Sequence, residues 1–284
     1  RKQNNIQHAF EKTFFKRAGQ HSYMFLQPPL YQYACSLSIE VVANYLRLTK
    51  KSVALLHPTF DNLADILKRQ GIRMIALEEK SILNPEKELK SLDTDALFLV
   101  CPNNPTGLDL TEKQYRTVIN YCKEHKKLLI VDSSFRFYSS LTAWDQYAAL
   151  KKSGIDFIVI EDTGKTWPTL ELKLGITVAS DSIYPDLLDI TNDFLLNVSP
   201  FIFVLLKEYI AAKSRNKSSF GAQKIVGTNR KELIKLLGGL PLSLPNPDSK
   251  ISVAWIKLPD GLRSSAFCKW LKAHGVYVLP GSPF

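Results

Sequence analysis

Residues 96–132 read ALFLVCPNNPTGLDLTEKQYRTVINYCKEHKKLLIVD and predict a strand, a helix and a second strand. The apolar runs at 96–100 and 127–131 are short, as expected of buried strands. Between them, Thr111 precedes the helical pattern at 112–125 and suits its N-terminal cap. Two strands joined by a helix form a right-handed crossover and lie parallel in one sheet. This stretch therefore predicts a βαβ unit.

The same alternation extends along the chain on both sides of this unit. Four more apolar runs predict buried strands, at 52–57, 72–77, 156–160 and 174–180. A helical pattern at 59–71 separates the first two, with Asp61 as its expected cap and Gly71 as its end. Strands that alternate with helices favour a mainly parallel sheet that is sandwiched by helices. We therefore expect an α/β fold of this kind.

The character of the chain changes after about residue 185, where a mostly helical region begins. Two apolar runs, a predicted helix between them and the preceding helical region indicate a smaller α+β domain; the runs, both expected as strands, are 251–258 and 276–280. We expect three parts: an N-terminal segment at 1–32, a large domain at 33–205 and a small C-terminal domain at 206–284. The chain stops at LPGSPF, within the expected small domain, so we expect that domain to be incomplete.

The composition is typical of a globular protein, with 45% hydrophobic and 23% charged residues among 284. No apolar stretch reaches the ~20 residues that span a bilayer, and the first residues lack the apolar core of a secretion signal. We therefore expect a cytoplasmic protein with no membrane partner. The four cysteines and five histidines lack the spacings of metal sites, so we expect free thiols and no structural metal.

The formal net charge of +10 leaves two classes of function open, nucleic-acid binding and an enzyme for anionic ligands. The lysines are scattered along the chain and do not form one long run with interleaved aromatic residues. This distribution favours the enzyme and predicts no nucleic-acid partner.

Polar side chains directly follow three of the predicted strands. Asn104, in the turn CPNNPTG, offers an amide, Asp132 a carboxylate and Lys165 an amine. Each has an ordinary explanation by itself, as a turn former, a helix cap or a surface lysine. The GKT at 164–166 is not a nucleotide loop, because Val159 stands where that motif needs glycine. Ligands bind beyond the carboxyl ends of such strands, so we expect the three groups to converge on one crevice.

Pyridoxal 5′-phosphate (PLP) requires such a set: a lysine for a Schiff base, an acid for the ring nitrogen and a donor for the phenolic oxygen. Through PNNPTG, VDSSF and the lysine, the chain resembles the class I/II, fold-type-I PLP-dependent aminotransferases, from about residue 33 to its end. The resemblance implies that Asn104 contacts the phenolic oxygen, that Asp132 contacts the ring nitrogen and that Lys165 forms the Schiff base.

The resemblance also implies a cradle for the rest of the cofactor. Phe60, in HPTF, falls where the family places an aromatic residue on the cofactor ring. The segment ACSLSIEVVANYL (34–46) resembles the turn and helix start that hold the phosphate. It implies Ser36, Leu37 and Ser38 as phosphate contacts, since backbone N–H groups at a helix N-terminus suit a dianion.

Three positions depart from the family's pattern. Phe135 replaces the tyrosine usually found three residues after the aspartate, so a bond to the phenolic oxygen is absent or is made by Tyr138 instead. A serine-containing stretch usually precedes the lysine, whereas here only Thr163 offers a hydroxyl and Asp162 adds a negative charge. Lys173 stands where an arginine is usual, and it is expected to pair with the phosphate as a point charge.

The resemblance implies an aminotransferase that acts on a small-molecule amino acid, as a homodimer. The segment EDTGKTWPT also resembles the lysine segment of PLP enzymes that tailor arginine-like amino acids, both oxidase/hydroxylases and capreomycidine-synthase-like cyclases. An oxidase/hydroxylase or cyclase that acts on an arginine-like amino acid is therefore the second hypothesis. A PLP-fold protein that binds without catalysis is the third, suggested by Phe135 and Lys173.

Overall fold

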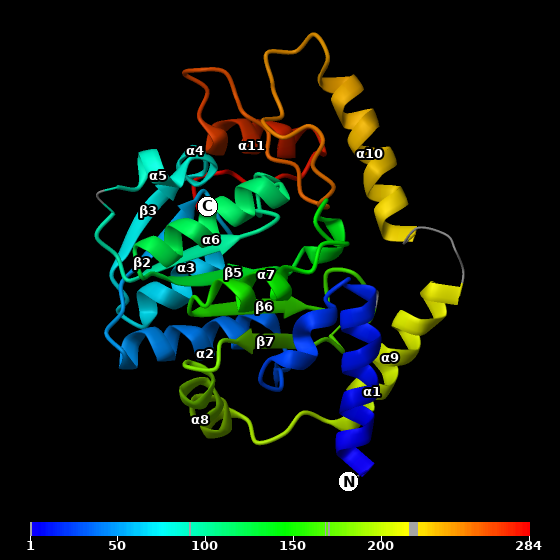
Figure 1. Ribbon diagram of the computed structural model, residues 1–284. Helices are drawn as coiled ribbons and strands as arrows, with labels where there is room; N and C mark the ends of the chain where they lie inside the picture. The colour runs from blue at the N-terminus through cyan, green and yellow to red at the C-terminus, as the bar shows by residue number, and fades with distance from the viewer. Residues whose placement is uncertain (1, 91, 168, 170, 216–220) are drawn as a thin grey trace.

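The computed structural model describes residues 2–90, 92–167, 169, 171–215 and 221–284 (Figure 1). Its centre is a sheet whose strands are, in spatial order, β1 (Leu30–Gln32), β7 (Gly175–Ala179), β6 (Phe157–Asp162), β5 (Leu128–Asp132), β4 (Ala96–Val100), β2 (Val53–His57) and β3 (Met74–Glu78). From β3 to β6 all neighbours are parallel, and only β7 and β1 pair antiparallel at one edge. The prediction of a mainly parallel α/β sheet is therefore confirmed.

Helices occur along the whole described chain, and several of them cover the two faces of this sheet. The helices that precede β7 in the sequence are α1 (Lys2–Arg17), α2 (Cys35–Leu48), α3 (Asp61–Arg69), α4 (Glu79–Leu83), α5 (Pro85–Glu88), α6 (Glu112–Glu124) and α7 (Gln146–Ser153), with the short 3-10 helices η1 (His21–Phe25) and η2 (Arg136–Tyr138). The helices that follow β7 are α8 (Tyr184–Phe194), α9 (Pro200–Arg215), α10 (Gly221–Leu237) and α11 (Ser264–Ala273).

Two hydrophobic clusters, one on each face, hold these layers together. Helices α2, α3 and α8 pack on one face, while α1, α6, α7 and α9 pack on the other. Strand residues alternate between them, so Leu97 and Leu99 join the second cluster and Phe98 and Val100 the first. Helix α1 runs beside α9 in Figure 1, and Phe10 packs against Phe203 there. The N-terminal segment is thus part of the main core.

The helix boundaries follow local chemistry in most places. Thr111 caps α6 through a reciprocal pair of bonds with Gln114, as predicted. The predicted cap at Asp61 is off by one residue: Phe60 precedes α3, and Asp61 is its first helical residue. The Asp61 carboxylate accepts from the N–H of its neighbour Asn62. Its charge still lies in the first turn of the helix, where it is favourable.

The two strands predicted in the C-terminal part do not form, and that expectation is wrong. Within the described part of this region, backbone pairing is limited to an isolated bridge between Ser243 and Lys257. A strand needs a neighbour to take up its N–H and C=O groups along its length. In the described residues the run at 251–258 has such pairing only at Lys257, and the run at 276–280 has no paired residue. The helix predicted between them is α11. The domain limits at residues 32 and 205 stay a prediction.

The cysteines agree with the expectation of free thiols. All four cysteines are free thiols, and Cys101 and Cys122 are buried. In the described residues, no helix combines the length and the apolar character needed to cross a membrane.

Candidate active site

A cavity of about 200 Å³ lies at the carboxyl ends of the central parallel strands. Six of the residues predicted for the cofactor site line it: Ser36, Phe60, Asn104, Asp132, Lys165 and Lys173. The sheet register explains this convergence, because Val100 at the end of β4 pairs with Asp132 at the end of β5. Asp132 in turn pairs with Ile160 of β6, two residues before that strand ends. Adjacent parallel strands therefore deliver their following residues to the same edge.

Asp132 is a nearly fully buried carboxylate at the end of β5. Its Oδ1 accepts from both the backbone N–H of Ser134, at 2.8 Å, and the Ser134 hydroxyl, at 2.5 Å. Its Oδ2 has a weaker neighbour, the thiol of Cys35 at 3.9 Å. Burial raises the pKa of Asp132 to about 6, against the lowering effect of Ser134. The carboxylate is therefore ionised at neutral pH. Its Oδ2 can accept a hydrogen bond from a protonated nitrogen.

Lys165 follows β6 on a tight turn. The Asp162 carboxylate accepts from the N–H of Gly164 at 2.5 Å, which is the geometry of an aspartate turn. The carbonyl of Lys165 accepts from the hydroxyl of Tyr138 at 3.1 Å, and its Nζ lies 5.9 Å from the ring centre of Phe135. The backbone of the lysine is thus fixed at both sides while its amine reaches the cavity.

Two predicted site residues, Thr163 and Tyr138, do not line the cavity but form hydrogen bonds that stabilise the Lys165 turn. Thr163 is fully buried, and its hydroxyl accepts from the N–H of Leu174 at 2.8 Å. It therefore ties the lysine turn to the start of β7. The Tyr138 hydroxyl donates to the Lys165 carbonyl, and a contact between Tyr138 and the phenolic oxygen stays a prediction.

The PNNPTG turn uses its two asparagines differently. Asn103 is fully buried and donates to the Pro58 carbonyl at 2.9 Å and to the Glu79 carboxylate at 2.7 Å. Thr106 also donates to Glu79. With Asn103 anchored, the next residue, Asn104, is presented to the cavity. Sequence spacing alone gave no indication of Glu79, which lies 24 residues earlier on α4.

The N-terminus of α2 forms one wall of the cavity. The helix begins at Cys35, and the Ala34 carbonyl accepts from the N–H groups of Leu37 and Ser38. Leu37 is 46% exposed, and the buried Ser38 hydroxyl donates to Gln32 at 2.7 Å. Neither lines the cavity; Cys35 and Ser36 do. The first N–H groups of a helix have no intrahelical acceptor, so this wall suits an anion.

Close packing beneath this wall fixes its position. A Cβ on Gly175, the first residue of β7, would lie 2.6 Å from the Ala34 carbonyl oxygen and 2.4 Å from the Ser38 hydroxyl. The helix start therefore sits directly on the strand. Sequence reasoning missed Cys35, Asn62 and Ser134 as lining residues. Of these, Ser134 had a usable signal, because a serine two residues after a strand-end aspartate commonly bonds to it.

The cavity is lined by equal numbers of acidic and basic side chains. Two carboxylates, Asp132 and Asp162, face two amines, Lys165 and Lys173. Burial raises the pKa of Asp162, and the bond from Gly164 and both lysines oppose that rise. Lys173 also pairs with the exposed Glu171 at 3.1 Å. Part of its charge is thus shared with a surface carboxylate.

The residues present fit PLP. Asp132 Oδ2 is buried and has only a thiol at 3.9 Å among the described residues, so a protonated ring nitrogen would complete its bonding. The α2 N-terminus and Lys173 would hold a phosphate, Phe60 would pack on the ring and Lys165 would reach an aldehyde carbon. The four functions converge on a single cavity.

Comparison with known proteins finds aminotransferases, both by family model and among curated relatives. The family model "Aminotransferase class I and II" matches residues 4–284. The aspartate aminotransferase of Pyrococcus horikoshii is 23% identical over 227 residues, which are 78% of this chain and 58% of that protein. The LL-diaminopimelate aminotransferase of Maridesulfovibrio salexigens is 29% identical over 192 residues, 66% of this chain and 48% of its own. The chain thus spans about half the length of these curated relatives.

Among solved structures, MppP soaked with the product 2-ketoarginine is similar over almost the whole chain. The TM-score is 0.87 and the sequence identity 34%, covering 99% of this chain and 80% of the MppP chain. The fold is therefore shared over almost the whole of this chain.

Proposed function

The chain belongs to the class I and II aminotransferase family, and on this basis we propose that it is a PLP-dependent enzyme that removes the amino group of an amino acid. The observation that carries the proposal is the single cavity that Asn104, Asp132 and Lys165 line together. An amide, a buried carboxylate and an amine, each from a different strand end, are what this chemistry requires.

Each side chain then has a distinct task. PLP, when bound, supplies an electron sink for the α-carbon of the amino acid. Lys165 would hold the cofactor covalently through Nζ and, once released, would take the proton from the α-carbon, which requires its neutral form. Asp132 would keep a proton on the ring nitrogen, because an ionised carboxylate favours the protonated partner. Asn104 would donate to the ring oxygen.

The surrounding backbone determines how well these groups are aimed. The Asp162–Gly164 turn and the Tyr138 bond fix the Lys165 backbone on two sides. The N–H groups at the start of α2 and the Lys173 amine would bind the phosphate. Because Lys173 is a point charge without a fork, we expect it to contribute less orientation than an arginine would.

The substrate class follows from one relative. MppP, 34% identical in a match that covers 99% of this chain, was soaked with its product 2-ketoarginine. We therefore propose an arginine-like amino acid as the substrate and its 2-keto acid as the product. Two reactions give such a product: transfer of the amino group to an acceptor keto acid, and oxidation with molecular oxygen as the oxidant. Transfer is the first candidate. Oxidation is the second, because the segment EDTGKTWPT resembles the lysine segment of PLP-dependent oxidases of arginine-like amino acids.

A homodimer is also proposed. Lys165 lines the cavity yet counts among the exposed residues of the single chain. A second copy placed over this opening would exclude water from the amine. Measurement of the molar mass in solution by light scattering tests this assembly, and a monomer that is fully active would contradict it.

The experiment that tests the function compares Lys165→Ala with Lys152→Ala, a change at an exposed lysine of α7. Lys165→Ala is expected to lose turnover and the PLP-dependent visible absorbance, while Lys152→Ala keeps both. Amino acids including arginine are supplied with an acceptor keto acid or with oxygen. Dependence on the acceptor selects transfer, and oxygen uptake selects oxidation. Full activity of Lys165→Ala would overturn the proposal.

A further inference from the structure

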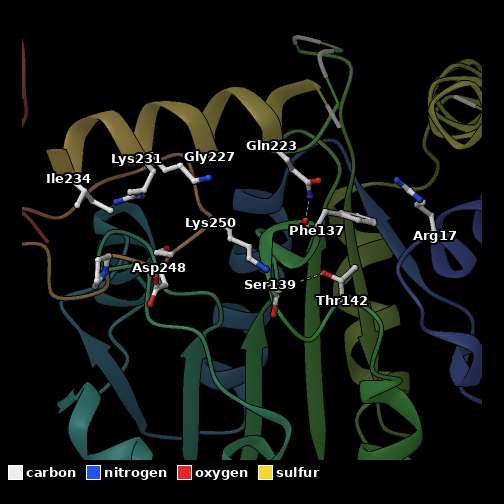
Figure 2. A pocket seen from close by; sticks show the side chains of 13 residues that line it. Arg17, Phe137, Ser139, Thr142, Gln223, Gly227, Lys231, Ile234, Asp248 and Lys250 are labelled. Atoms are coloured by element: carbon white, nitrogen blue, oxygen red, sulfur yellow. Dashed lines mark hydrogen bonds between the residues drawn. The ribbon is translucent and has the colours of Figure 1, made fainter. Parts of the chain in front are cut away.

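A second cavity, of about 540 Å³, is shown in Figure 2. Its walls come from α10, the segment 247–250, the loop after η2 and the end of α1, and it shares no lining residue with the first cavity. Four of its lining side chains are cations, Arg17, Arg230, Lys231 and Lys250, against a single carboxylate, Asp248. In Figure 2, Lys231 and Arg17 stand on opposite sides of the cavity with Lys250 between them.

Arg230 is the most unusual of these cations, because it is only 8% exposed. Its guanidinium donates to two backbone carbonyls, of Ile251 at 3.0 Å and of Val253 at 2.5 Å. No carboxylate in the described parts of the chain forms an ion pair with it. Carbonyl oxygens satisfy donors but carry no net charge, and burial lowers the pKa of this guanidinium. A buried charge without a counter-ion is costly, so this position suits a bound anion.

The neighbouring groups add to this positive site. Neither Lys231 nor Lys250 forms an ion pair with any described residue, and both belong to the cavity wall. Ser249 lies on the same wall, and its buried hydroxyl has no hydrogen-bond partner within the described chain. Asp248 offsets one positive charge at most. The excess of positive charge is therefore local to the cavity as well as a property of the whole protein.

We propose that this cavity binds a small organic dianion, a phosphate monoester or a dicarboxylate, through Arg230, Lys231 and Lys250. An arginine fork with flanking amines matches the oxygens of either group, and charge-assisted bonds of this kind are the strong ones. A cavity of this volume accommodates a metabolite-sized molecule. The site is independent of the proposed catalytic function, since no residue is shared between the two.

The test is a calorimetric titration of the PLP-loaded protein with inorganic phosphate and with succinate, at constant ionic strength. Loading with PLP fills the first cavity, so that binding reports on the second. The double variant Lys231→Gln with Lys250→Gln is compared with Lys224→Gln with Lys235→Gln. The second pair lies on the same helix, is exposed, lines neither cavity and changes the net charge equally.

At least one of the two anions is expected to bind with one-to-one stoichiometry. The cavity variant should raise its Kd by about tenfold or more, as expected for lost charge-assisted bonds, and the control should leave it nearly unchanged. Preference for phosphate or for succinate identifies which of the two ligand classes the site takes. Equal weakening in both variants would show diffuse surface attraction and overturn the proposal, as would absence of saturable binding by both anions.

Arg230→Lys provides a second test, because it keeps the charge and removes the fork. Weaker anion binding with an unchanged circular dichroism spectrum is the expected result, and unchanged binding would overturn the role of Arg230. If the lost bonds to Ile251 and Val253 unfold this variant, the lysine pair decides, since both of its positions are exposed.

Discussion

The substitution Asp132→Asn is expected to stabilise the protein without PLP while weakening its hold on PLP. In the folded protein burial raises the pKa of Asp132 from an ordinary value of 3.8 to about 6. The folded state thus binds a proton between these values that the unfolded chain has already lost, so the free energy of unfolding falls as pH rises through this window. A difference of about two pH units corresponds to about 3 kcal/mol above pH 6, as an upper limit. Asparagine keeps an oxygen for Ser134 and removes the charge.

Urea unfolding of the PLP-free protein at pH 4 and at pH 7.5 measures this effect. The gain in stability should appear at the higher pH and nearly vanish at the lower, whereas Asp65→Asn, at an exposed position on α3, should show neither change. With added PLP the unchanged protein should be more stable than Asp132→Asn, because the carboxylate charge that destabilises the PLP-free protein is the one that binds the ring nitrogen. A variant that is less stable at both pH values, or a difference that ignores pH, would refute this account of Asp132.

Two further substitutions test how the site is positioned. Gly175→Ala places a Cβ 2.6 Å from the Ala34 carbonyl oxygen, so it should destabilise the protein by about 1–3 kcal/mol and weaken PLP binding, as judged by urea unfolding and PLP titration. Gly227→Ala, which meets no atom within 4 Å, is its control and should be neutral or stabilising by up to about 1 kcal/mol. Glu79→Gln removes the negative charge to which Asn103 donates a hydrogen bond. It should lower the free energy of unfolding by about 1–2 kcal/mol and raise the Kd for PLP severalfold. An unchanged Kd would show that the PNNPTG turn keeps its conformation without Glu79.

The sequence predicted the sheet well because its signal is local and repeated. Each central strand is a short apolar run that is buried on both faces, and runs such as 96–100 and 127–131 carry that signal by themselves. The same residues predicted which side chains meet, since parallel strands share one edge. The short strand β1 was missed, because three residues within the expected N-terminal segment carry too little pattern.

The fine structure of the site was harder to predict, for a physical reason. Whether a residue at the start of α2 faces the cavity depends on the turn of the helix. Of the predicted residues Ser36, Leu37 and Ser38, only Ser36 lines the cavity, and Cys35 lines it beside Ser36. Glu79 acts on the PNNPTG turn across 24 residues of sequence, which no local pattern reveals. The apolar runs near the C-terminus, 251–258 and 276–280, resembled strands by composition, but pairing depends on a partner elsewhere.

The turn that presents Lys165 has a consequence for how such proteins are recognised. Asp162 interrupts the serine-containing stretch usual before the lysine, yet its carboxylate closes the turn on the N–H of Gly164. The turn is closed here by an acceptor on a short side chain, and serine carries an acceptor of that kind as well. A sequence motif that requires serine before the lysine would miss this chain, whereas a search for a side-chain acceptor that closes the turn would find it. Different residue types can therefore make the same hydrogen bond in this segment.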